Sequence, residues 1–176
     1  MVHPSFDALK PQRIDVRWPA NETVHPLERV AYGGLLQRLV SGERVYNVYD
    51  LLYRGLREAL EEKGYATSDR VSEGRFGAVD FRTPGGEIGE DVPFDAVLYS
   101  KVVGWHRRDR SFPNGVTVGL ELAIYKVPGA EKLYEIRESV FLRDDQHGSQ
   151  GSHGRFLESG LRHAAYRTLS GLPDRE

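Results

Sequence analysis

The segment Phe94–Gly104 (FDAVLYSKVVG) has the apolar pattern of a strand that runs through the middle of a sheet. Successive side chains of a strand point to opposite faces, so this segment has two different faces. One face comprises Ala96, Leu98, Ser100 and Val102, and the other comprises Val97, Tyr99, Lys101 and Val103. The first is small and apolar and suits helices packed across it. The second carries a lysine and a tyrosine and is expected to be partly wet.

Two stretches have the periodicity of amphipathic helices. Asn47 is expected to cap the first, and Gly64 is expected to end it in the left-handed conformation. Its apolar stripe comprises Val48, Leu51, Leu52, Gly55, Leu56, Ala59 and Leu60. The second helix follows the glycine-rich link 148–154, and its stripe comprises Leu157, Gly160, Leu161, Ala164, Thr168 and Leu169. The segment Leu27–Val40 has a weaker helical pattern, because two glycines interrupt it.

Alternating patterns predict the remaining strands. Ile14, Val16 and Trp18 give a first strand, Tyr65–Val71 a short edge strand, and Val79 and Phe81 a short strand within a long loop, 72–93. An antiparallel hairpin is predicted from two long alternating runs joined by the turn Val127-Pro128-Gly129-Ala130. The apolar positions of these runs are Val116, Val118, Leu120, Leu122 and Ile124, then Tyr134, Ile136, Val140 and Leu142.

These elements predict an α+β fold with a mostly antiparallel sheet of four to five strands and two long helices on one face. The reason is that both helices have one apolar stripe and the hairpin has one apolar face, and these must bury against each other. A chain of 176 residues suits one domain, 1–176, with a loosely ordered leader at 1–12 and a solvated tail at 174–176.

Composition excludes several functional classes. A formal net charge of −2 argues against general nucleic-acid binding, and the absence of cysteine rules out disulfides, thiol catalysis and thiolate zinc sites. No segment approaches the roughly 18 uninterrupted apolar residues of a membrane-spanning helix. The start, MVHPSFDALKPQR, lacks the apolar stretch of a secretion signal, so Met1 begins either a cytoplasmic chain or a mature fragment.

Candidate catalytic chemistry is weak throughout. His147, His153 and His163 lack a carboxylate at a ligand spacing, and Gly148, Gly151 and Gly154 match no nucleotide-binding pattern. Glu121, Glu135 and Glu138 fall in the hairpin, where cross-strand pairing with Arg137 or Lys132 explains them. There is no GxSxG motif. The sequence therefore predicts no metal, no cofactor and no enzymatic activity.

One charged and aromatic cluster supports an alternative function. Trp105, Arg107, Arg108 and Arg110 follow the predicted central strand and would bind an anionic partner by stacking and charge. Together with the glycine-rich link before the last helix, they define a cytoplasmic nucleotide- or RNA-binding domain as the alternative. Asp109 and the acidic net charge favour instead an ordinary solvated loop at Trp105–Arg110.

Three segments together resemble a known family. FDAVLYSKVVGW, the hairpin VTVGLELAIYKVPGAEKLYEIR and the tail FLESGLRHAAYRTLSGLP are similar to segments of small bacterial cell-envelope lipoproteins with the TolB amino-terminal-domain type of fold, and RWPANET resembles their loop after the first strand. The chain departs from the family at the turn Lys126–Gly129, at Tyr134 where tryptophan is common, and in lacking a lipobox and lipidated cysteine. The resemblance covers most of 13–173.

The resemblance implies an envelope assembly or transport-accessory role with protein partners and no reaction. The favoured interpretation is therefore a non-enzymatic protein-interaction module in the periplasm, associated with the outer membrane through a lipid anchor absent from this chain. The expected partner-binding residues are Asn21, Glu22, Thr23 and His25 in the loop after the first strand, with Trp105, Arg107 and Arg108. The loop 72–93 and the exposed sheet face are further expected contacts, and a cytoplasmic location remains the alternative.

Overall fold

The computed structural model describes residues 6, 11–27, 30–31, 45–67, 94–108, 115–127, 129–143 and 153–175. Its elements are β1 (Arg13–Val16), β2 (Ala20–Asn21), β3 (Val30–Ala31), β4 (Val45–Tyr46), α3 (Val48–Glu62), β5 (Ala66–Thr67), β6 (Ala96–Arg108), β7 (Gly115–Lys126), β8 (Lys132–Arg143) and α5 (His153–Leu169). In this part of the chain no helix is both long enough and apolar enough to cross a membrane.

The main sheet is mixed and mostly antiparallel, in the order β5-β1-β6-β7-β8. The long strands β6, β7 and β8 pair antiparallel, whereas β1 pairs parallel with both β5 and β6. The short strand β2 continues beside β6, where Ala20 and Asn21 pair with Lys101 and Val102. The predicted α+β class and the predicted hairpin are both confirmed.

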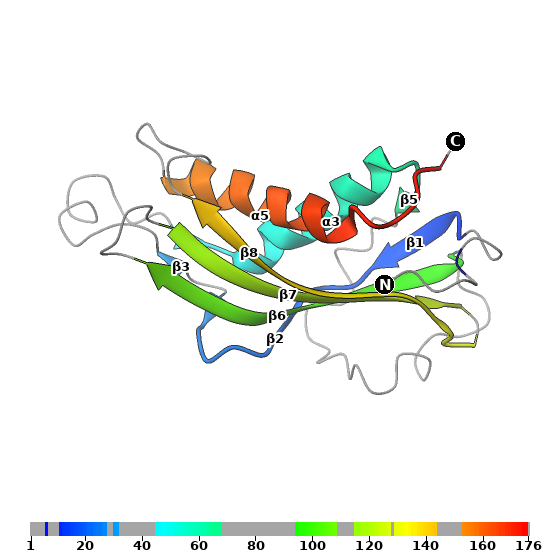
Figure 1. Cartoon of the computed structure of the whole chain (residues 1–176), viewed down its shortest axis with the longest axis horizontal. Coiled ribbons are helices and arrows are strands. Elements are labelled where there is room, and N and C mark those ends of the chain that lie inside the picture. The colour runs from blue at the N-terminus through cyan, green and yellow to red at the C-terminus, as the bar shows by residue number, and fades with distance from the viewer. Residues whose placement is uncertain are drawn as a thin grey trace.

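Both long helices cover the same face of this sheet and run in the same direction (Figure 1). The predicted Asn47 cap is present, because its Oδ1 atom accepts hydrogen bonds from the backbone N–H groups of Tyr49 and Asp50. The expected apolar stripes meet the hairpin in one core, in which Leu56, Leu161, Leu120 and Leu122 are fully buried. The packing of two helices on one sheet face is therefore confirmed.

Strand β6 is longer than predicted and contains a β-bulge. It pairs in register with β7 as far as Val102 opposite Leu120, then resumes with Gly104 opposite Gly119 and Trp105 opposite Val118. Val103 is the extra residue, and it reverses the order in which later side chains alternate between the two faces. Trp105 consequently points into the helix-covered core, which corrects the expected loop at this position.

The other face of the sheet is more buried than expected at one end. Val97 and Tyr99 are buried there in a second apolar cluster with Phe94, packed against Tyr125 and Val127. Lys101, two residues further along β6, remains partly exposed. The expected wet face is therefore found only beyond this cluster.

Four terminal or local expectations need correction. Val30 and Ala31 form a strand pair with β4 and not part of a helix, whereas 32–40 lies outside the described residues. Phe6, expected in a loose leader, is buried against Tyr65 with ring centroids 6.3 Å apart. The edge strand expected over Tyr65–Val71 is present as β5 but begins after Tyr65; it is described for Ala66 and Thr67, and 68–71 lies outside the described residues.

The fourth correction concerns the C-terminal tail, which is anchored at the end of α3. Lys63 Nζ donates to the carbonyl of Leu172 and to Asp174 Oδ1, both at 2.7 Å. The backbone N–H of Arg175 donates to the carbonyl of Lys63 at 2.8 Å. The tail therefore closes the end of the helical layer and is not simply solvated.

Candidate functional site

The loop that follows β1 is held against the middle of the sheet. Strand β2 begins it, and the backbone N–H of Glu22 donates to the carbonyl of Val102 at 2.9 Å, which extends the pairing with β6 by one residue. On the far side of the loop, Leu27 is completely buried in the core. Both ends of the segment 22–26 are thus fixed by the fold.

The Asn21 side chain organises the inside of the loop. Its Nδ2 donates to the carbonyl of His25 at 2.8 Å, and its Oδ1 accepts from the backbone N–H and the hydroxyl of Thr23 at 2.8 and 2.7 Å. The Thr23 hydroxyl oxygen in turn accepts from the backbone N–H of His25 at 3.2 Å. Asparagine and threonine favour such local turns because their short polar side chains reach nearby backbone groups. The loop is therefore preorganised.

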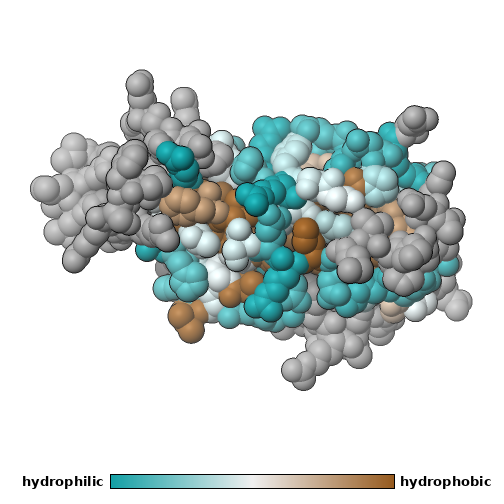
Figure 2. Space-filling view, in the orientation of Figure 1, coloured by the Kyte–Doolittle hydropathy of each residue, from teal (hydrophilic) through white to brown (hydrophobic). Residues whose placement is uncertain are grey.

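This preorganised loop presents a fully exposed apolar side chain. Val24 is 95% exposed, and it is the only large hydrophobic residue in the described part of the chain that is classed as exposed. Figure 2 shows that the described surface on one face of the molecule is mostly hydrophilic, with apolar colour confined to small separate areas. An isolated exposed valine is common on protein surfaces. Its distinction here is its place at the tip of a loop with fixed geometry.

An ion pair ties the same loop to the outer face of the sheet, the face opposite the helices. Lys101 Nζ lies 2.6 Å from Glu22 Oε1, and the lysine side chain is 14% exposed. In the strand register, Lys101 stands opposite Glu121 on β7, and Glu121 stands opposite Arg137 on β8. A row of charged residues therefore crosses the sheet beside the loop. The Glu22–Lys101 ion pair therefore places two charged side chains beside the loop that carries Val24.

The structure separates the other candidate residues from this loop. Trp105 is 7% exposed and belongs to the core, so its ring is not available for stacking. Arg107 is exposed on the helix-covered side of β6, opposite the face that carries Lys101. Arg108 ends β6, whereas Arg110, the link 148–152 and the loop 72–93 lie outside the described residues. The two sets of expected residues therefore do not form one site.

Sequence reasoning selected Asn21, Glu22, Thr23 and His25 from their polar character but did not single out Val24. The available signal was a lone apolar residue between turn-forming residues. No group of three or more His, Asp or Glu residues in the described part of the chain is arranged to hold a metal ion. The hairpin carboxylates behave partly as expected, since Glu121 stands opposite Arg137, but Glu138 pairs with Arg167 of α5 at 2.6 Å.

The fold is similar to that of several bacterial proteins of known structure. No family model matches the sequence, and no curated protein matches it. Among solved structures, the PelC dodecamer from Paraburkholderia phytofirmans is similar at 12% identity and a TM-score of 0.51, over 92% of this chain and 89% of that chain. Protein XCC0632 from Xanthomonas campestris, of the DUF330 family, is similar at 13% identity and a TM-score of 0.53, over 89% and 82%.

A third similar structure is lipoprotein GNA1162 from Neisseria meningitidis, at 16% identity and a TM-score of 0.48, over 91% of this chain and 99% of that chain. At that TM-score no argument follows from the likeness. The PelC and XCC0632 structures, whose TM-scores exceed 0.5, establish the fold alone, because their sequence identities to this chain are low.

Proposed function

We propose that this protein is a non-enzymatic interaction module of the bacterial cell envelope and that it binds a protein partner through the Asn21–His25 loop. The observation that carries the proposal is the exposure of Val24 at the tip of a loop whose backbone is already fixed. A rigid loop loses little conformational entropy on binding, so the burial of one apolar side chain contributes more to affinity.

The surroundings of Val24 support a protein partner. The centre of a protein interface is apolar and its rim is polar. Val24 provides an apolar centre, while Glu22, Thr23 and the Lys101 ion pair provide the rim. The PelC structure is a dodecamer, so this fold carries protein–protein contacts in at least one bacterial protein.

The second part of the proposal is that the protein is located in the bacterial cell envelope. It is supported by the resemblance of FDAVLYSKVVGW and the hairpin to TolB-type lipoprotein domains, with the outer membrane as the expected site of anchoring. The competing nucleotide- or RNA-binding interpretation has lost its stacking residue, because Trp105 is buried. Without the Trp105 ring, the expected cluster keeps the charge of its arginines but loses the stacking surface that was expected of it.

The proposal is tested by site-specific crosslinking in the bacterium that encodes the chain. A photoreactive amino acid is placed at position 24, and the matched control carries it at Glu131, an exposed position in the turn between β7 and β8. We expect a discrete protein adduct from position 24 only, in the envelope fraction. Recovery of the chain in the cytoplasm, or equal adducts from both positions, contradicts the proposal. Retention on heparin with a steep salt dependence would favour the nucleic-acid alternative.

A further inference from the structure

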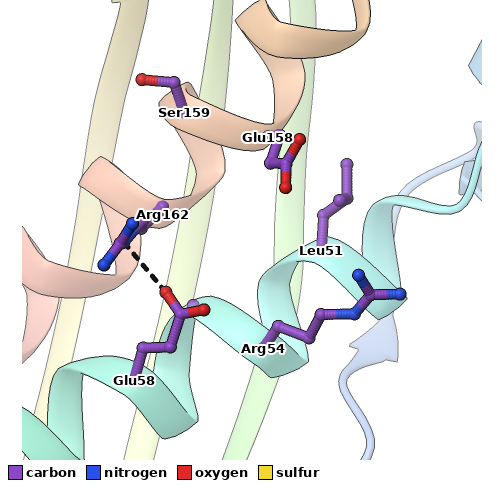
Figure 3. A pocket seen from close by; sticks show the side chains of 7 residues that line it. Leu51, Arg54, Glu58, Glu158, Ser159 and Arg162 are labelled. Carbon is purple, nitrogen blue, oxygen red and sulfur yellow. Dashed lines mark ion pairs between the residues drawn. The ribbon is translucent and has the colours of Figure 1, made fainter.

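The solvent side of the helical layer contains a groove between α3 and α5, with a volume of about 370 Å³. Its floor contains Leu51 and Gly55, both from α3. Charged and polar side chains line the walls, as Figure 3 shows: Arg54 and Glu58 from α3, and Glu158, Ser159 and Arg162 from α5. Leu51 is half-buried, so the floor offers apolar surface between two charged walls.

Of the four charged side chains in this groove, two form an ion pair with each other and two do not. Arg162 forms an ion pair with Glu58, with Nε and Oε2 2.9 Å apart, and its Nη2 lies 3.6 Å from Glu62. Arg54 and Glu158 are exposed, and neither has a charged or hydrogen-bonding partner among the described residues. Among the described residues, two opposite charges therefore stand without an ion-pair partner on opposite walls of one groove, with Leu51 between them (Figure 3).

We propose that this groove is a self-association surface, occupied by the same face of a second copy of this chain. A two-fold axis that runs along the groove, midway between the two walls, exchanges the position of Arg54 with that of Glu158. In such a pair, Arg54 of each copy meets Glu158 of the other across the facing walls. Two-fold interfaces use one self-complementary patch on both copies, and this face has that property.

The charge balance of the groove favours a second copy over a strongly charged partner. Its walls carry two arginines and two glutamates, so identical faces meet without net repulsion. Exposed ion pairs are weak and screened by salt, so the association should be weak and salt-sensitive. The groove lies on the helical layer, whereas the Asn21–His25 loop pairs with β6, so self-association and partner binding can be tested separately.

Sedimentation velocity over a wide range of protein concentration tests the proposal. The variants are Arg54→Glu, Glu158→Arg and the double reversal, in which each unpaired charge changes sign. Matched controls are Arg137→Glu on β8 and Glu131→Arg in the hairpin turn, which make the same charge changes at exposed positions outside the groove. Circular dichroism and the melting temperature of each variant establish that it is folded.

We expect the wild-type chain to dimerise, and either single reversal to weaken the dimer at least tenfold, because each reversal places like charges together twice. The double reversal should restore affinity to within about threefold of wild type, and the controls should leave it unchanged. Raising salt from low to physiological concentration should weaken the dimer several-fold. A monomer at all concentrations, failure of the folded double reversal to restore association, or an equal effect of the controls would overturn the proposal.

Discussion

Gly55 of α3 lies directly against the backbone of Arg162 on α5. A Cβ atom placed on Gly55 would lie 3.1 Å from the Cα of Arg162 and 3.3 Å from the Cβ of Ala165. The glycine therefore permits the close approach of the two helices. Gly55 and Arg162 also line the groove, so the helix contact and the groove share these two residues.

Replacement of Gly55 by alanine should destabilise the protein although alanine is the better helix former. The gain in helix propensity is about 0.5–1 kcal/mol, whereas crowding a packed core typically costs 1–3 kcal/mol. The nearest neighbour is backbone, which cannot rotate away, so we expect a net loss of about 1 kcal/mol in the free energy of unfolding, measured in urea.

Gly160→Ala is the matched control for this substitution. A Cβ atom on Gly160 would lie 3.0 Å from the Cδ1 atom and 3.3 Å from the Cβ atom of Leu142, so it would meet a buried side chain and not backbone. Its expected effect is within about 0.5 kcal/mol of zero, because the propensity gain offsets a smaller strain. Equal effects of the two substitutions would show that the backbone contact at Gly55 does not limit the helix packing.

Trp105→Ala should cause a large loss of stability. Truncation of a buried aromatic side chain typically costs about 3–5 kcal/mol, and Trp105 is 7% exposed in the main core. His106 is the control, because it is the next residue, lies on the opposite face of β6 and is exposed. His106→Ala should change the free energy of unfolding by less than about 0.5 kcal/mol. A small effect of Trp105→Ala on the midpoint of thermal unfolding would contradict the bulge at Val103.

This bulge shows where sequence reasoning reached its limit. The alternation of β6 correctly assigned Ala96, Leu98 and Val102 to the core, because a strand with a small apolar face must bury it. Continued without interruption, the same rule places Trp105 on the outer face. One extra residue reverses that assignment, and the pair Gly104 and Gly119 gives only an indirect sign of it. Local irregularities of this kind depend on the neighbouring strand.

The helices and hairpin were predictable because their signals are local. Asn47 caps α3 and Gly64, with a φ of 84°, follows its end, and each is fixed by the chemistry of a few adjacent residues. The parallel pairing of β1 with β6 and the anchoring of the tail on Lys63 join residues about 80 and 110 positions apart. No local pattern specifies such contacts. The same limit applied to the groove, whose two walls come from helices distant in sequence.

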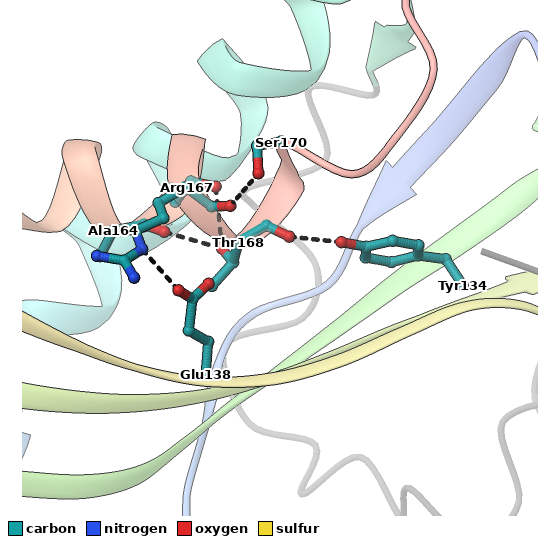
Figure 4. A network of polar contacts seen from close by, with 7 residues as sticks. Tyr134, Glu138, Ala164, Arg167, Thr168 and Ser170 are labelled. Atoms are coloured by element: carbon teal, nitrogen blue, oxygen red, sulfur yellow. Dashed lines mark hydrogen bonds and ion pairs between the residues drawn. The ribbon is translucent and has the colours of Figure 1, made fainter. Parts of the chain in front are cut away.

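Tyr134 should make stability depend on pH in the alkaline range. Its hydroxyl donates to the carbonyl of Thr168 at 2.6 Å within the α5 contact shown in Figure 4. Burial, and then the negative charge of Glu138, raise the pKa of Tyr134 to about 12 from its ordinary value near 10. A raised pKa favours the neutral phenol in the folded state. Its stabilising contribution is therefore complete below about pH 10 and is lost as pH rises toward 12.

The comparison of wild type with Tyr134→Phe isolates this effect, because the other alkaline groups are common to both proteins. At pH 8 the variant should be less stable by about 1 kcal/mol, through loss of the hydrogen bond to Thr168. Between pH 10 and 12 wild type should lose up to about 2–3 kcal/mol relative to the variant, the equivalent of the pKa difference. A stability difference that stays constant from pH 8 to 12 would show that Tyr134 ionises equally in both states.

Two substitutions in the Asn21–His25 loop should affect protein stability and partner binding differently. Asn21→Ala removes both the amide donor to His25 and the carbonyl acceptor for Thr23, so we expect a loss of about 1–2 kcal/mol in the free energy of unfolding. It should also reduce crosslinking from position 24, because the tip loses its fixed geometry. Val24→Ser should leave stability within about 0.5 kcal/mol of wild type, because the side chain is 95% exposed.

Both loop variants carry the photoreactive amino acid at His25, an exposed position next to Val24. The measurement is the amount of partner that co-purifies with each variant after crosslinking in the same envelope preparation. If the apolar tip is the centre of the interface, Val24→Ser weakens partner capture at least about tenfold, the lower end of the range expected for a buried valine side chain. Undiminished capture by Val24→Ser, together with reduced capture by Asn21→Ala, would assign recognition to the polar rim. Undiminished capture by both variants would show that the partner binds elsewhere on the chain, and the proposal that it binds the Asn21–His25 loop would be wrong.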